Sequence, residues 1–273
     1  MNLEPNIVIL SGGTGPERNV SLASGKALSA SLSSSYKTKL VDINKNALLS
    51  ELNPLTDLVF PVIHGEFGED GQLQSLMDSA GLEYCGSATQ SSRLCINKIA
   101  TKQSVSDVGV RVPKSFQFND PAQCNAVELI NKLGENLVIK PVAQGSSVSL
   151  FLISGLCELE KQLDELSPGD WMVESRVYGR EVTIGVLGNH PLGVVEVIPM
   201  GGLYDYERKY TSGATEYRFP AVLDQETENG QKGMRGWGQR MFSSILYLNE
   251  DFTGGDTFFP DINKTIKHKR WHK

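Results

Sequence analysis

Apolar and polar positions fall into short blocks along the chain, and their spacing predicts a mixed α/β protein. Residues 6–10 form a buried type of strand that runs into a glycine-rich turn at 11–15, after which a helical pattern begins near Val20. A strand, a glycine turn and a helix form the opening unit of a parallel α/β sheet, in which the helix N-terminus faces the ligand-binding edge. Residues 37–41 and 57–63 predict two further strands of this sheet.

The middle of the chain is organised around a predicted hairpin-like flap. An apolar run at 137–139 leads to Lys140, then to a Gly-Ser-Ser tip at 145–147, and then to a second apolar run that ends at Ile153. The N–H and hydroxyl groups of the tip suit phosphate oxygens, and an ordinary hairpin is the alternative. Around the flap the pattern predicts helices at 99–108, 122–133 and 157–166, an extended pair at 110–113 and 115–118, and strands at 171–174, 181–187 and 192–198.

Composition and charge exclude several classes of protein. The chain has 273 residues and a formal net charge of −6, which argues against a general nucleic-acid binder. No apolar run approaches the ~20 residues needed to span a bilayer, and residues 7–10 are too short for a signal-peptide core. The four cysteines contain no CxxC pair and indicate reduced thiols in a cytoplasmic protein.

The first glycine-rich turn matches neither of the common nucleotide-binding fingerprints. Gly13 and Gly15 form a GxG, but Arg18 stands where a dinucleotide-binding fingerprint has its third glycine, and no P-loop lysine follows. The charged pair Glu17–Arg18 beside this turn is interpreted as a solvated helix start in preference to a substrate clamp.

A second polar cluster follows the predicted strand at 57–63. His64, Glu69 and Asp70 share one glycine-rich loop. Ligands of open α/β sheets bind beyond the carboxyl ends of the strands, which is where this loop falls. The cluster is therefore a candidate functional site, with a structural His-Gly turn as the alternative.

Two glutamates and one long loop are further candidates in the second half of the chain. Glu174 ends an apolar strand and Glu181 begins the next, so each is interpreted as accepting from a nucleotide or as capping the sheet edge. The loop at 200–217 is polar, glycine-rich and aromatic, and a loop of that length in a compact domain is usually a lid. Lys209 and Tyr210 on this lid loop supply a cation and a phenol.

Together these segments resemble the D-alanine–D-alanine ligases of the ATP-grasp superfamily. Each motif alone is weak, but the ordered set, from about residue 6 to about residue 238, is specific. The resemblance implies an α/β ATP-grasp fold with an N-terminal parallel α/β (pre-ATP-grasp) domain and an incomplete last domain. The motifs that carry it are residues 12–22, 64–74, 138–147, 174–181 and 204–221.

The resemblance implies that ATP lies between two small sheets and that the flap closes over its phosphates. It also implies Mg²⁺, with Mn²⁺ as an alternative ion. The residues implied to bind the nucleotide are Lys98 and Lys140 at the phosphates, Ser146 and Ser147 in the flap, Glu174 and Glu181 at the adenine and ribose, and Lys209 on the lid loop.

The same resemblance implies how two D-alanine molecules are joined. Glu17 binds the ammonium of the first D-alanine, and His64 lies near its carboxylate, which attacks the γ-phosphate to give an acyl phosphate. The amine of the second D-alanine then displaces phosphate, while Lys209 neutralises the transferring group. Ser146 and Tyr210 resemble the hydrogen-bonding trio that the family forms with Glu17, and Tyr210 favours a dipeptide over an ester. The implied setting is peptidoglycan synthesis by a cytoplasmic homodimer with no nucleic-acid or membrane partner.

The resemblance ends near residue 238. The family continues with an Arg-x-Asp and a Glu-x-Asn whose side chains hold magnesium, whereas here no aspartate follows two residues after Arg240, so the metal ligands are unknown. Residues 243–260 instead resemble part of a prolyl-hydroxylase-type 2-oxoglutarate/iron oxygenase, but no His-x-Asp occurs, so no working iron site is expected. We expect a ligase truncated within its last domain and joined to an unrelated fragment, with a solvated basic tail at 264–273.

These inferences divide the chain and leave three functions open. The first is the ligase itself, the second a catalytically inactive nucleotide-binding remnant, and the third another ATP-grasp carboxylate–amine ligase. The expected units are an N-terminal α/β substrate domain at 1–95, an ATP-grasp small domain with the flap at 96–182, a partial C-terminal ATP-grasp domain at 183–238, and a divergent tail at 239–273.

Overall fold

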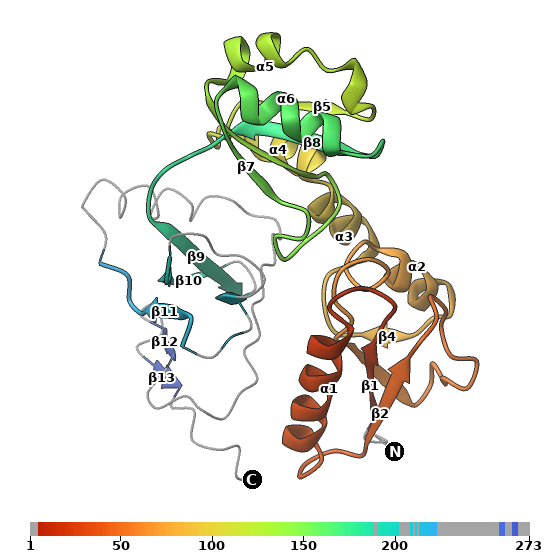
Figure 1. Ribbon diagram of the computed structural model, residues 1–273. Helices are drawn as coiled ribbons and strands as arrows, with labels where there is room; N and C mark the ends of the chain where they lie inside the picture. The colour runs from red at the N-terminus through yellow and green to blue at the C-terminus, as the bar shows by residue number, and fades with distance from the viewer. Residues whose placement is uncertain are drawn as a thin grey trace.

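The structure is a computed structural model that describes residues 5–187, 190–201, 208–209, 211, 213–222, 257–259 and 264–266. Within these residues the chain forms two four-stranded sheets, one three-stranded sheet and one two-stranded pair (Figure 1). No helix in these ranges has the length and apolar character needed to cross a membrane. The bounds of the four predicted units stay a prediction.

The N-terminal sheet is parallel, as the pattern of the first sixty residues predicted. Its strand order is β2-β1-β3-β4, and every pairing is parallel. The central strand β1 is buried along almost its whole length, as expected for a strand covered on both faces. The elements are β1 (Asn6–Gly12), α1 (Arg18–Leu32), β2 (Thr38–Ile43), β3 (Asp57–Pro61), α2 (Gln72–Ser79) and β4 (Glu83–Tyr84).

The second sheet is antiparallel, with strand order β5-β8-β6-β7. Helices α5 and α6 cover one face, where Leu129 and Leu159 pack against Leu137, Ile139 and Val173. Helix α4 lies toward the N-terminal sheet in Figure 1. The elements are α3 (Thr89–Ile96), α4 (Lys98–Asp107), β5 (Ser115–Phe118), η1 (Pro121–Gln123), α5 (Ala126–Leu133), β6 (Asn136–Pro141), β7 (Phe151–Ser154), α6 (Leu156–Glu165) and β8 (Trp171–Ser175).

The third sheet is also antiparallel and consists of β9 (Glu181–Leu187), β10 (His190–Pro199) and β11 (Thr215–Arg218) in the order β11-β10-β9. Arg180 directly precedes β9, and its Nε and Nη2 contact the two carboxylate oxygens of Glu196 in β10 at 2.6 and 2.7 Å. Its Nη1 donates to the carbonyl of Val222 at 2.7 Å. These hydrogen bonds hold the pKa of the buried Glu196 carboxyl below its usual value. Farther along, β12 (Thr257–Phe259) pairs antiparallel with β13 (Lys264–Ile266).

Three local predictions were wrong. Residues 110–113 form no strand, and β5 at 115–118 pairs with β8 instead of with that segment. The helix predicted at 122–133 is divided into η1 and α5, because the side chain of Asn125 accepts from the N–H of Glu128 and starts a new helix. The last residues of the predicted lid loop belong to β11, where the long-range pairing with β10 outweighs the local polar pattern.

Candidate functional site

Helix α1 holds the first glycine turn in one conformation. The N–H of Gly12 donates to Ser21 Oγ at 2.8 Å, and that hydroxyl donates to the carbonyl of Val62 at 2.6 Å. Gly12 has φ +95°, and a Cβ there would lie 2.4 Å from Asp42 Oδ1, so no other residue fits. Glu17, directly before α1, is only 5% exposed. Its interpretation as part of a solvated helix start was therefore wrong.

Arg18 stabilises the same turn. Its Nη2 contacts Asp42 Oδ2 at 2.7 Å, and its Nη1 donates to the carbonyls of Gly13 and Ile43, both at 3.0 Å. These contacts join the turn to the end of β2. Arg18 thus has a structural role, while its neighbour Glu17 is the buried carboxylate at the sheet edge.

The loop after β3 lies against Glu17. A Cβ at Gly65 would be 3.6 Å from Glu17 Oε2. His64 Nδ1 lies 3.5 Å from Glu69 Oε1, and Glu69 raises the pKa of His64 although burial opposes this shift. Within the described residues, His64 Nε2 is buried and has no hydrogen-bond partner. The structure therefore brings the predicted residues Glu17 and His64 together at one sheet edge.

Asp70, the third charged residue of that loop, has a structural role. Its carboxylate accepts from the N–H groups of Phe67 and Gln72, both at 2.9 Å. These bonds fix the turn that leads into α2. Glu69 also accepts from a backbone N–H of the loop, that of Gly65 at 3.0 Å, and its other oxygen faces His64.

The predicted flap is confirmed as the segment between the antiparallel strands β6 and β7. Ser146, Ser147 and Ser149 have φ values of 50°, 58° and 52°. Such left-handed conformations cost non-glycine residues about 1 kcal/mol or more each, so other contacts must hold the flap. One of these contacts is the hydrogen bond that the Ser146 hydroxyl donates to Glu17 Oε1 at 2.5 Å. The flap tip therefore reaches the N-terminal turn, 129 positions earlier in the chain.

Side-chain alternation explains how Lys140 and Glu174 come to share one face of the second sheet. In β6, Leu137 and Ile139 point into the core under α5 and α6, so Lys140 points to the opposite face. In β8, Val173 joins that core, and Glu174 likewise faces away. The pairing of β6 with β8 makes the two charged residues diagonal neighbours.

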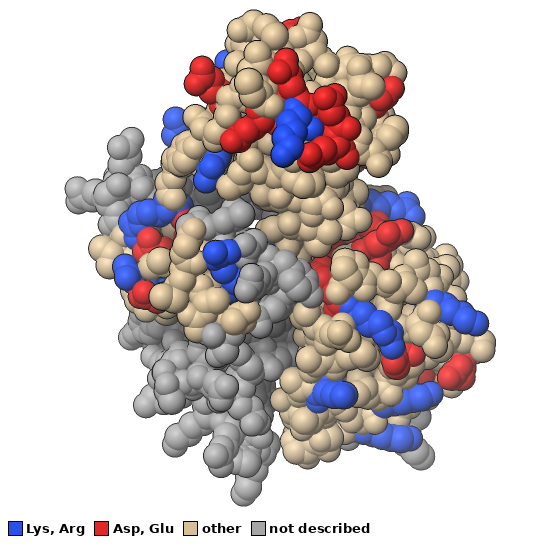
Figure 2. Space-filling view, viewed as in Figure 1, with Lys and Arg blue, Asp and Glu red and all other residues tan. Residues whose placement is uncertain are grey.

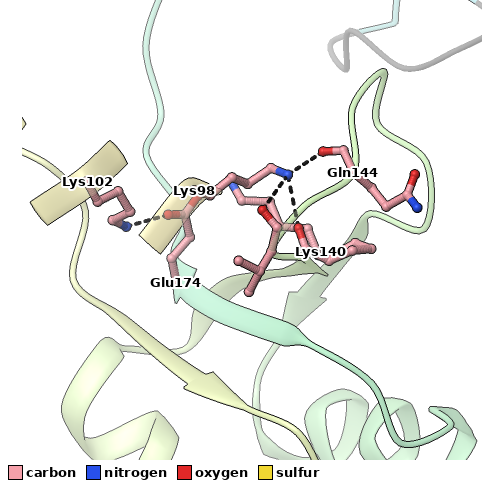
Figure 3. Close-up of polar contacts among 7 residues, drawn as sticks. Lys98, Lys102, Lys140, Gln144 and Glu174 are labelled. Atoms are coloured by element: carbon pink, nitrogen blue, oxygen red, sulfur yellow. Dashed lines mark hydrogen bonds and ion pairs between the residues drawn. The ribbon is translucent and has the colours of Figure 1, made fainter. Parts of the chain in front are cut away.

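Lys98, the first residue of α4, contacts the base of the flap (Figure 3). Its Nζ donates to the carbonyls of Pro141 and Val142, at 3.0 and 3.3 Å, and to that of Gln144. Burial and, to a smaller extent, the positive charge of Lys140 lower the pKa of Lys98 to about 8, although Glu174 opposes both effects. Lys98 thus brings a perturbed cation to the start of the flap.

Glu174 is ion-paired to two lysines from different elements (Figure 3). Lys102 Nζ lies 2.6 Å from Oε2, and Lys140 Nζ contacts Oε1. Burial opposes ionisation of Glu174, but the hydrogen bonds from Lys102 and Lys140 outweigh it and lower the pKa of the carboxyl. The carboxylate is therefore held ionised in a largely buried position.

Lys102 is the residue of this cluster that sequence reasoning missed. It lies one helical turn after Lys98 on α4, and residues four apart share a helix face. That spacing was visible in the sequence. The partner was not, because Glu174 lies 72 positions later and reaches Lys102 only through the fold.

Glu181 begins β9 and interacts electrostatically with Lys209 of the lid loop. Partial burial raises the pKa of the Glu181 carboxyl, and the charge of Lys209 opposes this. Two residues predicted for the nucleotide site, 28 positions apart in the sequence, thus lie close enough to interact. Tyr210 lies outside the described residues.

No metal centre is found in the part of the chain that the structure describes. There, no group of three or more histidine, cysteine, aspartate or glutamate side chains is arranged to hold a metal ion. Residues 223–256, which include the expected point of departure from the family and most of the oxygenase-like segment, lie outside the described ranges.

Two family models match the chain. The model described as D-ala D-ala ligase N-terminus matches residues 44–87, and the one described as D-ala D-ala ligase C-terminus matches residues 105–243. The second match contains the flap, Glu174 and Glu181. It extends slightly beyond residue 238, where the sequence analysis placed the end of the resemblance.

Curated relatives and solved structures agree with these matches. The D-alanine--D-alanine ligase of Trichlorobacter lovleyi is 35% identical over 95% of this chain and 84% of the relative, and that of Aquifex aeolicus is 40% identical over 78% and 73%. A Bacillus anthracis ligase structure has a TM-score of 0.72 at 26% identity, covering 84% of this chain and 76% of that one. Its ATP complex has a TM-score of 0.71 at 26% identity, covering 85% and 76%. The VanG D-Ala:D-Ser ligase of Enterococcus faecalis has a TM-score of 0.68 at 28% identity, covering 85% and 81%. With its parallel N-terminal sheet, its flap and these relatives, the chain belongs to the D-alanine–D-alanine ligase family.

Proposed function

We propose that the chain is an ATP-dependent carboxylate–amine ligase that joins two D-alanine molecules into the dipeptide used for peptidoglycan. The relatives at 35 and 40% identity support this function. The observation that carries it is the hydrogen bond from Ser146 to Glu17, which joins the flap to the buried carboxylate of the first turn. A flap that contacts the substrate turn can couple nucleotide binding to closure of the amino-acid site.

The nucleotide half of the proposed site lies on the face of the second sheet turned toward α4. Lys98 and Lys140 supply cations for the phosphates, and Ser147 supplies donors from the flap. Glu174 and Glu181 would accept from the adenine and ribose. The contact of Lys98 with three carbonyls at the end of β6 and the start of the flap supports this arrangement, as does the interaction between Glu181 and Lys209.

The amino-acid half lies at the edge of the N-terminal sheet. Glu17 would bind the ammonium of the first D-alanine, because it is a buried carboxylate whose neighbours include the flap hydroxyl of Ser146. His64 would lie beside the substrate carboxylate, with Glu69 favouring its protonated form. We retain Tyr210 as the third member of the trio with Glu17 and Ser146.

In the proposed reaction, an oxygen of the first D-alanine carboxylate forms a bond to the γ-phosphorus of ATP, and the bond to ADP breaks. The amine of the second D-alanine then attacks the acyl carbon, loses a proton, and inorganic phosphate leaves. Lys209, on the lid loop, would stabilise the charge on the transferring phosphoryl group. A site covered by flap and lid also keeps water from the acyl phosphate.

We propose Mg²⁺ as the ion that accompanies ATP, with its protein ligands unassigned, and we derive no step through it.

We also propose a homodimeric, cytoplasmic protein with no nucleic-acid partner. The four cysteines, all in the described part of the chain, form no disulfide. In Figure 2 acidic side chains gather on the unit that carries α5 and α6, and the net charge of the chain is −6. This negative charge supports the proposal that the protein has no nucleic-acid partner.

The test is phosphate release from ATP and magnesium, with and without D-alanine, followed by identification of the dipeptide. D-alanine-dependent release supports the ligase. Release that requires D-serine as the second amino acid would instead assign the specificity printed for the VanG neighbour. Protection against heat by ATP without any release would identify an inactive nucleotide-binding remnant.

Two substitutions test the assigned residues. Glu17→Gln and Lys209→Ala are each expected to reduce dipeptide formation by at least about 100-fold, since each removes a charge at the reacting groups. The matched controls are Glu128→Gln and Lys132→Ala, which remove the same charges from an exposed pair on α5 and should leave the rate unchanged. A normal rate in either site variant would contradict its assignment.

A further inference from the structure

The ion pairs around Glu174 place competing demands on Lys140. The Lys140 side chain is 21% exposed and contacts the Glu174 carboxylate, whose side chain is 11% exposed. In the proposed function, Lys140 must turn its charge toward a phosphate. If Lys140 were the sole partner of Glu174, that movement would leave a buried carboxylate without compensation, which is strongly unfavourable.

Lys102 resolves this conflict geometrically. It contacts the other carboxylate oxygen, Oε2, at 2.6 Å, and its side chain is 15% exposed. The two lysines therefore occupy different oxygens of one carboxylate and come from different elements, Lys102 from α4 and Lys140 from β6 (Figure 3). Glu174 keeps one cationic partner when the other leaves.

We propose that Lys102 is a positioning residue that holds and neutralises Glu174, so that Lys140 is released to the phosphates of the nucleotide. This inference rests on the proposed function, because it takes the face that carries Lys140 and Glu174 as the nucleotide site. Lys102 does not itself contact the nucleotide in this scheme. It acts through Glu174, and its effect is on how strongly Lys140 binds the phosphates of the nucleotide.

The proposal predicts an effect that depends on the phosphates of the ligand. Without Lys102, Glu174 retains Lys140 as its remaining partner, and a bound triphosphate loses a cation. Adenosine has no phosphate and therefore does not need Lys140. A purely structural role for Lys102 would instead weaken the binding of adenosine and ATP alike.

The experiment measures dissociation constants for ATP and for adenosine by calorimetry, on the full chain without D-alanine. Lys102→Met keeps the aliphatic stem but removes the charge. It is expected to lower the preference for ATP over adenosine roughly tenfold, the scale of one charge-assisted hydrogen bond. Lys102→Arg should preserve the preference. The control Lys132→Met removes the same charge from the exposed pair on α5 and should also preserve it.

A second pair of variants isolates the role of Glu174. In Glu174→Gln no charged oxygen retains Lys140, so adding Lys102→Met to this background should change the ATP preference by no more than about twofold, the scale of a screened charge. This pair also carries the test if Lys102→Met alone does not fold, because neither variant leaves a buried carboxylate short of a partner. If adding Lys102→Met to Glu174→Gln lowered the preference for ATP over adenosine roughly tenfold, as expected for Lys102→Met alone, the proposal would be overturned.

The possible failures can be told apart. Normal ATP binding by the wild type, together with an unchanged ATP preference in Lys102→Met, overturns this inference alone. A wild-type chain that binds neither ATP nor adenosine overturns the proposed function, and this inference with it.

Discussion

Glu174 and Glu181 are the same residue type, lie seven positions apart, and were predicted to share one role. Their surroundings differ sharply. Glu174 lies in β8, buried between Lys102 and Lys140, and these lysines lower its pKa against the effect of burial. Glu181 lies at the exposed start of β9, where partial burial of its carboxyl raises the pKa and the charge of Lys209 opposes this shift.

The difference teaches that position at the end of a strand does not set the chemistry of a carboxylate. The charged partners do, and they come from elements distant in the sequence. Glu174 is an ionised anchor in a cluster of lysines. Glu181 is a carboxylate for which the cost of burial outweighs the attraction of its cationic neighbour, so its pKa is raised.

The largest predicted difference between the two glutamates is in stability. Glu174→Ala leaves two lysines facing each other in a largely buried site, and it should lower the free energy of unfolding by about 3 kcal/mol. Glu181→Ala should change it by less than about 0.5 kcal/mol, as for most exposed positions. Urea unfolding of both variants measures this. Equal losses would show that the two carboxylates are not distinguished by their partners.

The pH dependence of stability should differ in sign between the same two positions. The pKa of Glu174 lies below the ordinary value of 4.5, so its stabilising effect is complete above pH 4.5 and is lost as the pH falls through the lowered pKa. The destabilisation by Glu174→Gln should therefore shrink toward low pH.

The pKa of Glu181 lies above 4.5, so the native state binds the proton more tightly and the wild type loses stability as the pH rises through the window above 4.5. Glu181→Gln removes this loss, so its free energy of unfolding should rise relative to that of the wild type as the pH increases above 4.5. Unfolding free energies at several pH values compare the two variants, and slopes of the same sign would refute the contrast.

The smallest predicted effect concerns Lys98, a lysine whose pKa is influenced by Glu174. Its pKa of about 8 should rise when the phosphates of ATP approach, so that binding takes up a fraction of a proton above about pH 8. The affinity should correspondingly decrease as the pH rises through this range. Calorimetry at pH 9 in two buffers of different ionisation enthalpy measures the uptake. Lys98→Met should abolish it, and uptake that persists in this variant would assign the proton to another group.

Much of the fold could be predicted because its signals are local. The apolar run at 6–10 and the glycines after it predicted the opening of a parallel sheet, and the runs on either side of the Gly-Ser-Ser tip predicted the antiparallel flap. The extended pair predicted for 110–113 and 115–118 was wrong because strand pairing depends on partners elsewhere in the chain, and 115–118 pairs with β8. The same reason explains why Glu17 was misread as solvated, since the flap residue Ser146 that donates to it lies 129 positions later.

The sequence by itself determined the family and the residues that carry charge. Ordered motifs identified the ligase resemblance, and the alternation of β6 places Lys140 on the face opposite the core. Only the tertiary structure decided which charges meet. The contacts of Ser146 with Glu17 and of Lys102 with Glu174 span 129 and 72 positions, and each requires separate elements to pack together. The residue type determines whether a side chain can carry a charge, whereas the packed molecule determines the pKa of that side chain and its partner.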